Sequence, residues 1–386
     1  MIIGIDARAV SNPQPGGFKT YSDNLIKSLL KLECDLKFHL FFDRLPPPNY
    51  LLNDKIHYSI TRSHPKFVGA IIREQLILPS KVIIKKLDIF HSLCNTGPIF
   101  LNKPSIVTIH DVIQLKTPQI LRGSLNQRFR STMINIYSQK VIPQISKRAS
   151  AVITVSNFEK QQIINTLNIS PDRVFVTYIA ASEIFTILTK DELYKAKTTL
   201  ETEFNIFNPF ILGVGSEPRK NINLLIEAYS NLGDSVINKY QLVIICANKE
   251  IAKDFQKKSK GLGLEDRIRV FTNINHEKLK LFYTSAEMLV FLSNRESFGL
   301  PPLEAMACGL PVISSDTSSL PEILGDAPLF VNINNKRDIV LAINELLNNY
   351  LMKNELINKG LDQSKLYSWD GTAKKTINVY NTICCL

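Results

Sequence analysis

The sequence lacks most features that mark membrane, secreted or metal-stabilised proteins. No run of about 18 consecutive apolar residues is present, so we expect no membrane-spanning helix. The first residues, Met1 to Asp6, lack a basic region and soon reach a carboxylate, which predicts a β-strand rather than a secretory signal. The six cysteines form no C-x-x-C pair, which argues against a zinc site or disulfide framework and favours reduced thiols in a cytoplasmic protein.

A glycine-rich dinucleotide fingerprint is also missing. No G-x-G-x-x-G follows the first expected strand, although this motif normally admits the pyrophosphate of a dinucleotide at a helix start. A nicotinamide-dependent dehydrogenase is therefore disfavoured. Any nucleotide must be held in another way.

Acidic residues are scarce in the first half of the chain. Residues 1–185 contain 23 Lys and Arg against 12 Asp and Glu, whereas the remainder contains 23 of each, so the net charge of +11 lies in the first half. The segments 62–86 and 122–148 concentrate it. A basic face predicts an anionic partner such as a membrane surface or a phosphorylated acceptor, although it could also be only a solubilising surface. We expect no nucleic acid, because the aromatic residues do not alternate with the basic ones.

Short apolar strands alternate with helical patterns throughout, which predicts an α/β protein with parallel sheets. The pattern restarts near residue 210, which indicates two Rossmann-like domains. We expect a first domain at 1–187, a second at 208–366, and a final helical stretch at 367–386 that returns to the first domain. The expected strands are Ile2 to Ile5, Phe38 to Phe42, Ile89-Phe90, Ile106 to Ile109, Ala151 to Val155, Phe210 to Gly215, Leu242 to Cys246, Ile268 to Phe271, Met288 to Leu292 and Pro311 to Ser314.

The densest motif is S-N-R-E-S-F-G-L-P-P-L-E-A-M-A-C-G-L-P at 293–311. It predicts a strand, then a loop carrying Glu296 and Gly299, then a helix that begins near Pro301. The exposed N–H groups and dipole of such a helix start favour an anion, and glycine lets a ligand approach the backbone. We expect Glu304 in the first turn, where its carboxylate could accept hydrogen bonds from a ribose diol. Alternatively, Glu304 only complements the helix dipole.

Two further strand ends carry polar side chains. In G-V-G-S-E-P-R-K-N at 213–221, Arg219 and Lys220 could neutralise a phosphate, because a guanidinium forks onto two oxygens and an ammonium is a movable charge. In V-T-I-H-D at 107–111, His110 ends a strand where it could meet a substrate. Taken alone, the Arg-Lys pair is more often a solvated pair, and the histidine is more often a turn histidine bonded to a backbone carbonyl.

Three local motifs complete the pattern. The glycines of P-G-G-F at 15–18, with Gly17 opening a helix, could admit a diphosphate or sugar, or form only a turn. The sequences S-N-F-E at 156–159 and S-L-P-E at 319–322 have the form of capping boxes, so we interpret both as structural.

These motifs, in this order and spacing, resemble the retaining glycosyltransferases of family 4 (glycosyl transferases group 1), which have the GT-B fold. The resemblance runs nearly end to end and is strongest from Phe210 to Ala327, with E-x7-E inside its F-G-L-P frame. It implies two Rossmann-like domains facing each other across a cleft. Two departures stand out: Ser216 occupies a position where many members have arginine, and the first loop reads G-F-K-T-Y at 17–21, without a second glycine.

The resemblance also implies roles for the motif residues. Glu304 would hold the donor ribose, and Glu296 would hold the donor sugar and phosphate with the backbone of Phe298, Gly299 and Leu300. Arg219 and Lys220 would neutralise the diphosphate. His110 would contact the transferred sugar, and Gly17 would give the phosphate or acceptor room. Neither a metal nor another cofactor is implied.

We therefore expect a retaining transfer of a hexose, with mannose preferred, from a nucleoside diphosphate sugar such as GDP-mannose. The acceptor would be a hydroxyl of a saccharide or lipid-linked saccharide, as in cell-surface polysaccharide synthesis. The enzyme would be cytoplasmic, with peripheral contact at the inner face of an anionic membrane through its basic first domain. The alternatives are a nucleotide-sugar epimerase of the same fold and a catalytically degenerate nucleotide-sugar-binding protein.

Overall fold

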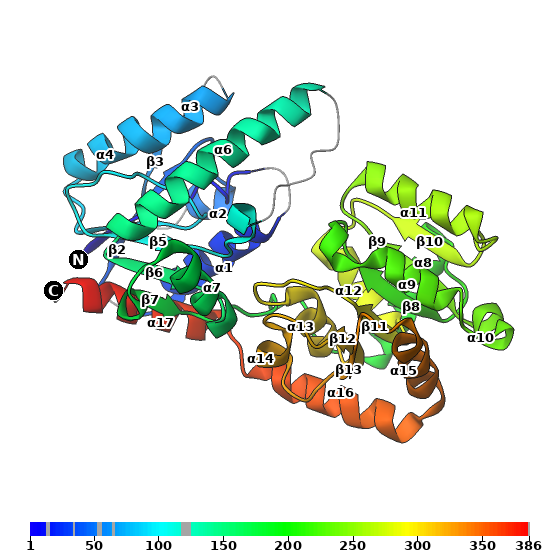
Figure 1. Cartoon of the computed structure of the whole chain (residues 1–386). Coiled ribbons are helices and arrows are strands. Elements are labelled where there is room, and N and C mark those ends of the chain that lie inside the picture. Colours follow the sequence, from blue (N-terminus) through cyan, green and yellow to red (C-terminus); the bar gives the residue numbers. More distant parts are fainter. Residues whose placement is uncertain (13–15, 34, 52–55, 64–65, 117–124, 385–386) are drawn as a thin grey trace. The chain divides into compact units, whose positions relative to one another are not determined.

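A computed structural model describes residues 1–386 except 13–15, 34, 52–55, 64–65, 117–124 and 385–386 (Figure 1). The chain divides into two compact units, the first comprising Met1–Ile179 and Trp369–Leu386 and the second Ala180–Ser368. Each unit is an α/β structure built on one parallel sheet. Within the described ranges, none of the helices has the length and apolar character needed to cross a membrane.

The described part of the first unit contains a seven-stranded sheet with the order β3-β2-β1-β4-β5-β6-β7. Its strands are β1 (Ile2–Asp6), β2 (Lys37–Phe42), β3 (Ile56–Ile60), β4 (Ile89–Ser92), β5 (Ser105–Thr108), β6 (Ala151–Thr154) and β7 (Val174–Val176). Because β1 pairs in parallel with both β2 and β4, the strand order reverses beside β1. In open α/β sheets, ligands bind at the carboxyl edge of the strands at such a reversal.

Helices cover both faces of this sheet. They are α1 (Gly17–Lys31), α2 (Pro48–Leu51), α3 (Lys66–Ile72), the π-helix η1 (Arg73–Ile77), α4 (Leu78–Ile84), α5 (Ile113–Lys116), α6 (Leu125–Arg148), α7 (Asn157–Leu167), the 3₁₀ turn η2 (Pro171–Arg173) and α17 (Trp369–Cys384). Phe90 of β4 packs with Leu78 and Val82 of α4. The next residue, His91, hydrogen-bonds to Tyr380 of α17 at 2.8 Å. Since successive strand side chains point to opposite faces, α4 and α17 cover opposite faces.

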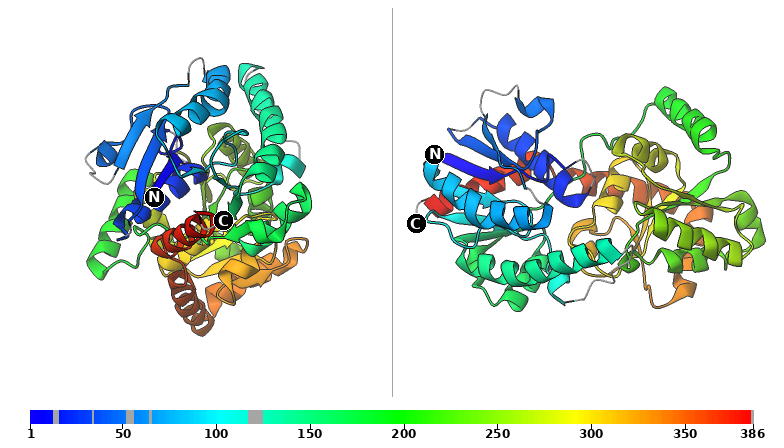
Figure 2. Two further views of the ribbon diagram at one scale, coloured as in Figure 1. Left: turned by 90° about the vertical axis from the view of Figure 1, so that its left-hand side faces the viewer. Right: turned by 90° about the horizontal axis from the view of Figure 1, so that it is seen from above.

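The last helix belongs to the first unit, although it follows the second in sequence. In both views of Figure 2, α17 lies beside α1. The hydroxyl of Thr372 on α17 also donates to the carbonyl of Tyr178 at 2.5 Å. These contacts attach the end of the chain to the first sheet.

The second unit contains, in its described residues, a six-stranded parallel sheet with the order β10-β9-β8-β11-β12-β13. Its strands are β8 (Phe210–Val214), β9 (Gln241–Ile245), β10 (Ile268–Phe271), β11 (Met288–Phe291), β12 (Val312–Ser315) and β13 (Leu329–Val331). Its helices are α8 (Lys190–Phe204), the 3₁₀ turn η3 (Pro218–Lys220), α9 (Ile222–Tyr229), α10 (Asp234–Lys239), α11 (Lys249–Gly261), α12 (His276–Ser285), α13 (Leu300–Ala307), α14 (Leu320–Leu324), α15 (Lys336–Asn348) and α16 (Tyr350–Lys365). The strand order reverses between β8 and β11.

The boundary between the units lies before the predicted join. Residues from Ala180 onward belong to the second unit. There the ring of Phe185 lies 5.6 Å from that of Tyr283, and α8 packs against α12. Residues 180–187, which the sequence placed in the first domain, and the stretch between the two expected domains are thus part of the second unit.

The expected strands are present, and the structure adds three that the sequence analysis missed. These are β3, β7 and β13, and each lies at or beside the edge of its sheet, where an apolar run is shorter or mixed with polar residues. The cap predicted at Ser156 is also present, because its hydroxyl accepts a hydrogen bond from the Glu159 backbone N–H at 3.1 Å.

Candidate nucleotide-sugar site

The candidate site of the second unit lies at the carboxyl edge of its sheet, beside the reversal of strand order. The loop after β8 carries Arg219 and Lys220, and the loop after the neighbouring strand β11 carries Glu296. The loop after β12 carries Ser318 and Ser319. Parallel strands end at the same edge, so three loops from distant parts of the sequence meet where ligands bind in such sheets.

Glu296 binds both predicted cations. Its Oε1 atom lies 2.9 Å from Arg219 Nη1 and 2.6 Å from Lys220 Nζ. Burial raises the pKa of Glu296, but attraction to Lys220 and Arg219 outweighs it, so the net pKa lies below its ordinary value. The Lys220 ammonium also lies 4.7 Å from the centre of the Phe291 ring. The three predicted residues thus form one charged cluster that is largely withdrawn from water.

Serines from the loop after β12 hold the backbone of the Glu296 loop. The Ser318 hydroxyl accepts from the Glu296 N–H at 2.8 Å. The Ser319 hydroxyl bridges the carbonyls of Glu296 and Phe298, each at 3.1 Å. The interpretation of Ser319 as a helix cap was wrong, because its side chain caps no N–H of α14 and instead binds this loop. Sequence gave no signal for this role, since the two loops meet only through the pairing of β11 with β12.

Gly215 allows Lys220 to reach this position. A Cβ atom added at Gly215 would lie 2.6 Å from Cβ and 2.7 Å from Cγ of Lys220. Contacts below 3.0 Å are sterically excluded for real side chains. The glycine at the end of β8 is thus required by the path of the lysine and not by a turn alone.

The helix α13 begins directly at the predicted loop. Gly299 is its N-cap with φ of 106°, a conformation that glycine adopts without strain. The helix then starts at Leu300, before the expected Pro301, so Glu304 lies beyond the first turn in which it was predicted. The ring of the preceding Phe298 is buried and lies 5.5 Å from that of Tyr367. The start of α13 therefore presents backbone N–H groups next to the charged cluster.

Glu304 is only 6% exposed, and its Oε2 accepts a hydrogen bond from the Tyr283 hydroxyl at 3.2 Å. Burial raises the pKa of Glu304 to about 7, although Tyr283 and the charge of Lys220 oppose the increase. Lys220 therefore acts on both glutamates. Tyr283 was missed by the sequence analysis, because α12 carries no motif and meets α13 only through packing.

In the first unit, His110 follows β5 and is fixed by the loop after β4. Its Nε2 donates to the carbonyl of Leu93 at 2.9 Å, and its backbone N–H donates to Asn95 Oδ1 at 2.7 Å. Its ring also contacts the rings of Phe18 and Tyr21, with centroids at 5.0 and 4.5 Å. Burial lowers the pKa of His110. The lowered pKa keeps the ring neutral at neutral pH, and because Nε2 carries the proton, Nδ1 can accept a hydrogen bond.

Gly17 begins α1 beside a cavity of about 440 Å³. A Cβ at Gly17 would meet no described atom within 4 Å, so the described packing does not explain the glycine. The cavity is lined mainly by polar and small residues from helices and from loops at the carboxyl edge of the sheet, including Arg8, Asn12, Arg44, Asn95, Thr96 and Gln114.

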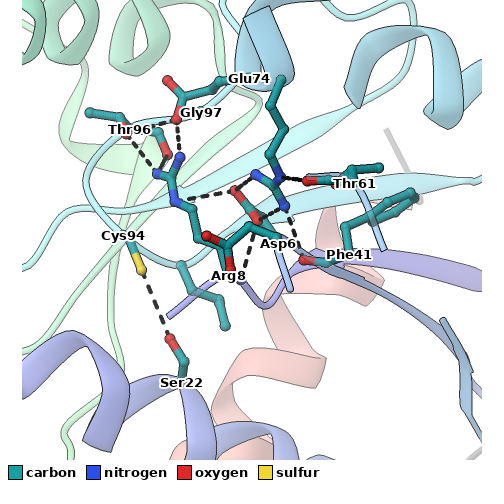
Figure 3. A network of polar contacts seen from close by, with 12 residues as sticks. Asp6, Arg8, Ser22, Phe41, Thr61, Glu74, Cys94, Thr96 and Gly97 are labelled. Atoms are coloured by element: carbon teal, nitrogen blue, oxygen red, sulfur yellow. Dashed lines mark hydrogen bonds and ion pairs between the residues drawn. The ribbon is translucent and has the colours of Figure 1, made fainter. Parts of the chain in front are cut away.

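Below this cavity lies a buried charge network that the motifs did not reveal (Figure 3). Arg73 Nη2 lies 2.8 Å from Asp6 Oδ1, and both side chains are 1% exposed. Arg8 forms ion pairs with both Asp6 and Glu74. Glu74 also accepts a hydrogen bond from the Tyr137 hydroxyl at 2.6 Å. Burial raises the pKa of Asp6, but Arg73 and Arg8 outweigh it and the net pKa lies below the usual range. The network fixes the end of β1 to η1.

Two parallel-sheet units with a cationic, glutamate-lined edge at the strand reversal are typical of the GT-B class of glycosyltransferases. Family models support this class over most of the chain. The model described as Glycosyltransferase Family 4 matches residues 15–180, and that described as Glycosyl transferases group 1 matches residues 204–363. The O-antigen chain mannosyltransferase B of Escherichia coli is 30% identical over 385 residues, which cover 95% of this chain and 96% of that protein. The chain therefore belongs to glycosyltransferase family 4.

Other relatives match only part of their own length. The O-antigen chain mannosyltransferase RfbU of Salmonella typhimurium is 28% identical over 212 residues, or 54% of this chain and 55% of that protein. The serotype-specific mannosyltransferase WbdA of Escherichia coli is 30% identical over 207 residues, or 53% of this chain and 24% of that protein. The chain thus spans about a quarter of the length of WbdA.

Solved structures share the GT-B fold. Sucrose-phosphate synthase from Thermosynechococcus elongatus has a TM-score of 0.75 at 17% identity, covering 99% of this chain and 98% of that chain. The Anabaena protein HepE, solved in complex with UDP-glucose, has a TM-score of 0.72 at 15% identity, covering 99% of each chain.

Proposed function

We propose that the protein transfers a hexose from a nucleoside diphosphate sugar to a hydroxyl of a saccharide or lipid-linked saccharide during polysaccharide synthesis. The observation that carries this proposal is the Arg219–Glu296–Lys220 cluster beside the start of α13. A diphosphate is the anion that two convergent cations and a helix start would bind best. Mannose is the preferred sugar, because several relatives at about 30% identity are mannosyltransferases, among them the one that matches nearly the whole chain.

In this proposal the cluster binds the donor. Arg219 and Lys220 neutralise the diphosphate, and Glu296 orients both while it binds the sugar with the backbone of Phe298, Gly299 and Leu300. Glu304 accepts hydrogen bonds from the ribose. Arg219 Nη1 and Lys220 Nζ converge on one carboxylate oxygen of Glu296, so both cations are held at the same point of the sheet edge. Charge that develops on the departing diphosphate is thereby stabilised without reorganisation.

From the first unit, His110 contacts the transferred sugar and Gly17 gives the phosphate or acceptor room. The cavity beside Gly17 is a suitable place for the acceptor, because its lining offers hydrogen-bonding groups to hydroxyls. The reaction retains the anomeric configuration, with the leaving phosphate taking the acceptor's proton. We propose that no metal is needed, since the basic side chains and the helix start supply the positive charge.

We further propose that GDP-mannose is the donor and that the enzyme works in the cytoplasm with peripheral contact at the inner face of an anionic membrane. The base is open to test, because the structurally similar HepE was solved with UDP-glucose. Of the two basic segments of the first domain, 122–148 lies partly outside the described residues, Arg122 included.

The test is a thermal-shift panel of GDP, UDP, TDP and ADP with their mannose and glucose conjugates, without added metal, followed by a transfer assay. We expect one donor to stabilise the wild type and to transfer its hexose, and Glu304→Ala to lose the shift. Glu345→Gln, at an exposed position of α15, is the matched control. Donor binding without transfer to any acceptor would instead support a degenerate binding protein, and conversion of the donor alone would support an epimerase.

A further inference from the structure

The segment formed by α3, η1 and α4 buries the two charged residues of η1 and exposes several aliphatic residues. Arg73 and Glu74 are each 1% exposed and belong to the buried network. Val68, Ile72 and Leu76 are 55, 41 and 64% exposed. Their four-residue spacing places them along one side of the helical segment. Surface helices normally show the opposite arrangement, with a polar face toward water.

The exposed apolar side continues into α4. Ile83 and Ile84 are 56 and 66% exposed, and with Val68, Ile72 and Leu76 they define what we call the outer stripe. Figure 1 shows α3 and α4 continuing one another along the outside of the first unit. Contiguous exposed aliphatic residues mark an interaction surface, whereas scattered ones do not.

The charges next to the outer stripe are positive. Lys85 and Lys86 follow α4 and are exposed, and Lys81 lies one turn earlier. The single acid within residues 62–86 is Glu74, which is buried and bonded to Arg8 and Tyr137. The next acid, Asp88, accepts a hydrogen bond from the Ile2 backbone N–H at 2.7 Å. In the described part of the chain, lysines therefore outnumber acids at the carboxyl end of the stripe, where Asp88 is bonded to the Ile2 backbone.

A cavity of about 470 Å³ opens at the same end. It is lined by Ile2, His39, Ile56, His57, Tyr58 and Lys85. Burial, together with the nearby lysines, lowers the pKa of His39 to about 4, so this imidazole is uncharged at neutral pH. Among the described residues of this lining, the charged group is the Lys85 ammonium, which is suited to an anionic ligand.

We propose that the outer stripe and Lys81, Lys85 and Lys86 dock on a bilayer that contains anionic lipid, with the aliphatic side chains among the acyl chains and the lysines at the headgroups. Aliphatic side chains without hydrogen-bonding groups suit the acyl region, and lysines at the border suit phosphate. A second copy of the chain fits less well, because self-contact would set one positively charged surface against another. This docking surface deepens the proposed function, since it would keep the enzyme near a lipid-linked acceptor.

The experiment is sedimentation of the full chain with vesicles of phosphatidylcholine alone or mixed with phosphatidylglycerol, at low and high salt. We expect binding to the mixed vesicles only, and a decrease with salt. Leu76→Ser with Ile84→Ser should lower binding at least tenfold. Lys85→Gln with Lys86→Gln should also lower it at least tenfold, at about fivefold for each lysine.

Matched controls are available in the second unit. Leu341 and Leu351 are 55 and 81% exposed, so Leu341→Ser with Leu351→Ser removes similar apolar surface. The exposed pair Lys257→Gln and Lys260→Gln removes the same charge. Donor thermal shifts should be unchanged in all four variants, which separates this test from failure of the proposed function.

Three outcomes would overturn the proposal. The wild type could fail to bind the mixed vesicles, or the outer-stripe variants could bind them as tightly as the controls do. Alternatively, size-exclusion chromatography could show that the wild type is a dimer and that the Leu76 and Ile84 substitutions separate it, which would assign the surface to a second copy.

Discussion

The hydroxyl of Tyr283 lies 3.2 Å from Oε2 of Glu304, in a position where the carboxyl group is 6% exposed. The phenol stabilises the carboxylate, but burial dominates and raises the pKa of Glu304 to about 7. The residue proposed to bind ribose therefore changes charge near neutral pH. This gives the site two measurable pH dependences.

The first concerns donor affinity. If ribose binds the Glu304 carboxylate, protonation must weaken binding, so the affinity for the nucleoside diphosphate should rise with pH and level off above about 7. Because about half of the Glu304 carboxyls are ionised at pH 7 and about a tenth at pH 6, we expect a roughly fivefold loss of affinity between these values. Glu304→Gln should bind the nucleoside diphosphate more weakly, and its remaining pH dependence should come from titration of the ligand's phosphate. Calorimetric titrations of both proteins would measure the difference, and parallel pH profiles would contradict the ribose role.

The second concerns folding. In the unfolded chain Glu304 titrates near its ordinary value of 4.5, whereas in the folded protein it titrates near 7. Between these values the folded state binds the extra proton, so stability falls as pH rises and the loss is complete above about 7. This pKa difference corresponds to a loss of roughly 3 kcal/mol in the free energy of unfolding. Relative to wild type, Glu304→Gln should therefore gain stability across this range.

Urea unfolding followed by far-UV circular dichroism at pH 5 and 8 would measure this gain. All other groups titrate alike in the two proteins, so the difference isolates Glu304. The Glu345→Gln control on α15 should show no such gain. A difference between wild type and Glu304→Gln that does not change with pH would show that the carboxyl keeps its ordinary pKa.

Local sequence patterns predicted the strands and the main motif, but not the contacts between elements that are distant in sequence. Apolar strands separated by helical periods indicated both sheets, and the 293–311 motif located Glu296 and Glu304. Ser319 was misinterpreted because its S-x-x-E spacing is that of a cap, whereas its hydroxyl is used by a loop from another strand. Tyr283, Arg73 and Glu74 were missed because their partners are set by packing between elements rather than by spacing.

A third prediction concerns Gly215. Alanine there would place a Cβ 2.6 Å from Lys220 Cβ, so the lysine must move away from Glu296. We expect Gly215→Ala to weaken nucleoside diphosphate binding by roughly tenfold, which is the effect of losing about one charged hydrogen bond. At Gly261, the last residue of α11, a Cβ would meet nothing within 4 Å, so Gly261→Ala is the control and should bind normally. Equal affinities for the two variants would show that Lys220 does not contribute to phosphate binding.

The buried pair of Asp6 and Arg73 gives the last prediction. Asp6→Asn would leave the Arg73 guanidinium, 1% exposed, without its carboxylate, and an unpaired buried charge costs about 3–5 kcal/mol. Removing the charge as well, in Asp6→Asn with Arg73→Met, should recover part of that loss, because the cost comes mainly from the orphaned cation. By contrast, Asp362→Asn at the exposed pair with Lys365 should have little effect.

Tryptophan fluorescence can measure the loss of stability in Asp6→Asn directly. The single tryptophan of the chain, Trp369, lies on α17 in the first unit, with its ring 6.1 Å from that of Tyr21. Tryptophan fluorescence during urea unfolding therefore reports the unit that contains Asp6, whereas circular dichroism reports both units. We expect Asp6→Asn to move the fluorescence transition to lower urea and the double variant to return part of the way. A double variant less stable than Asp6→Asn would show that Arg73 is needed chiefly for its hydrogen bonds to Thr61 and Phe41, and not as the partner of Asp6.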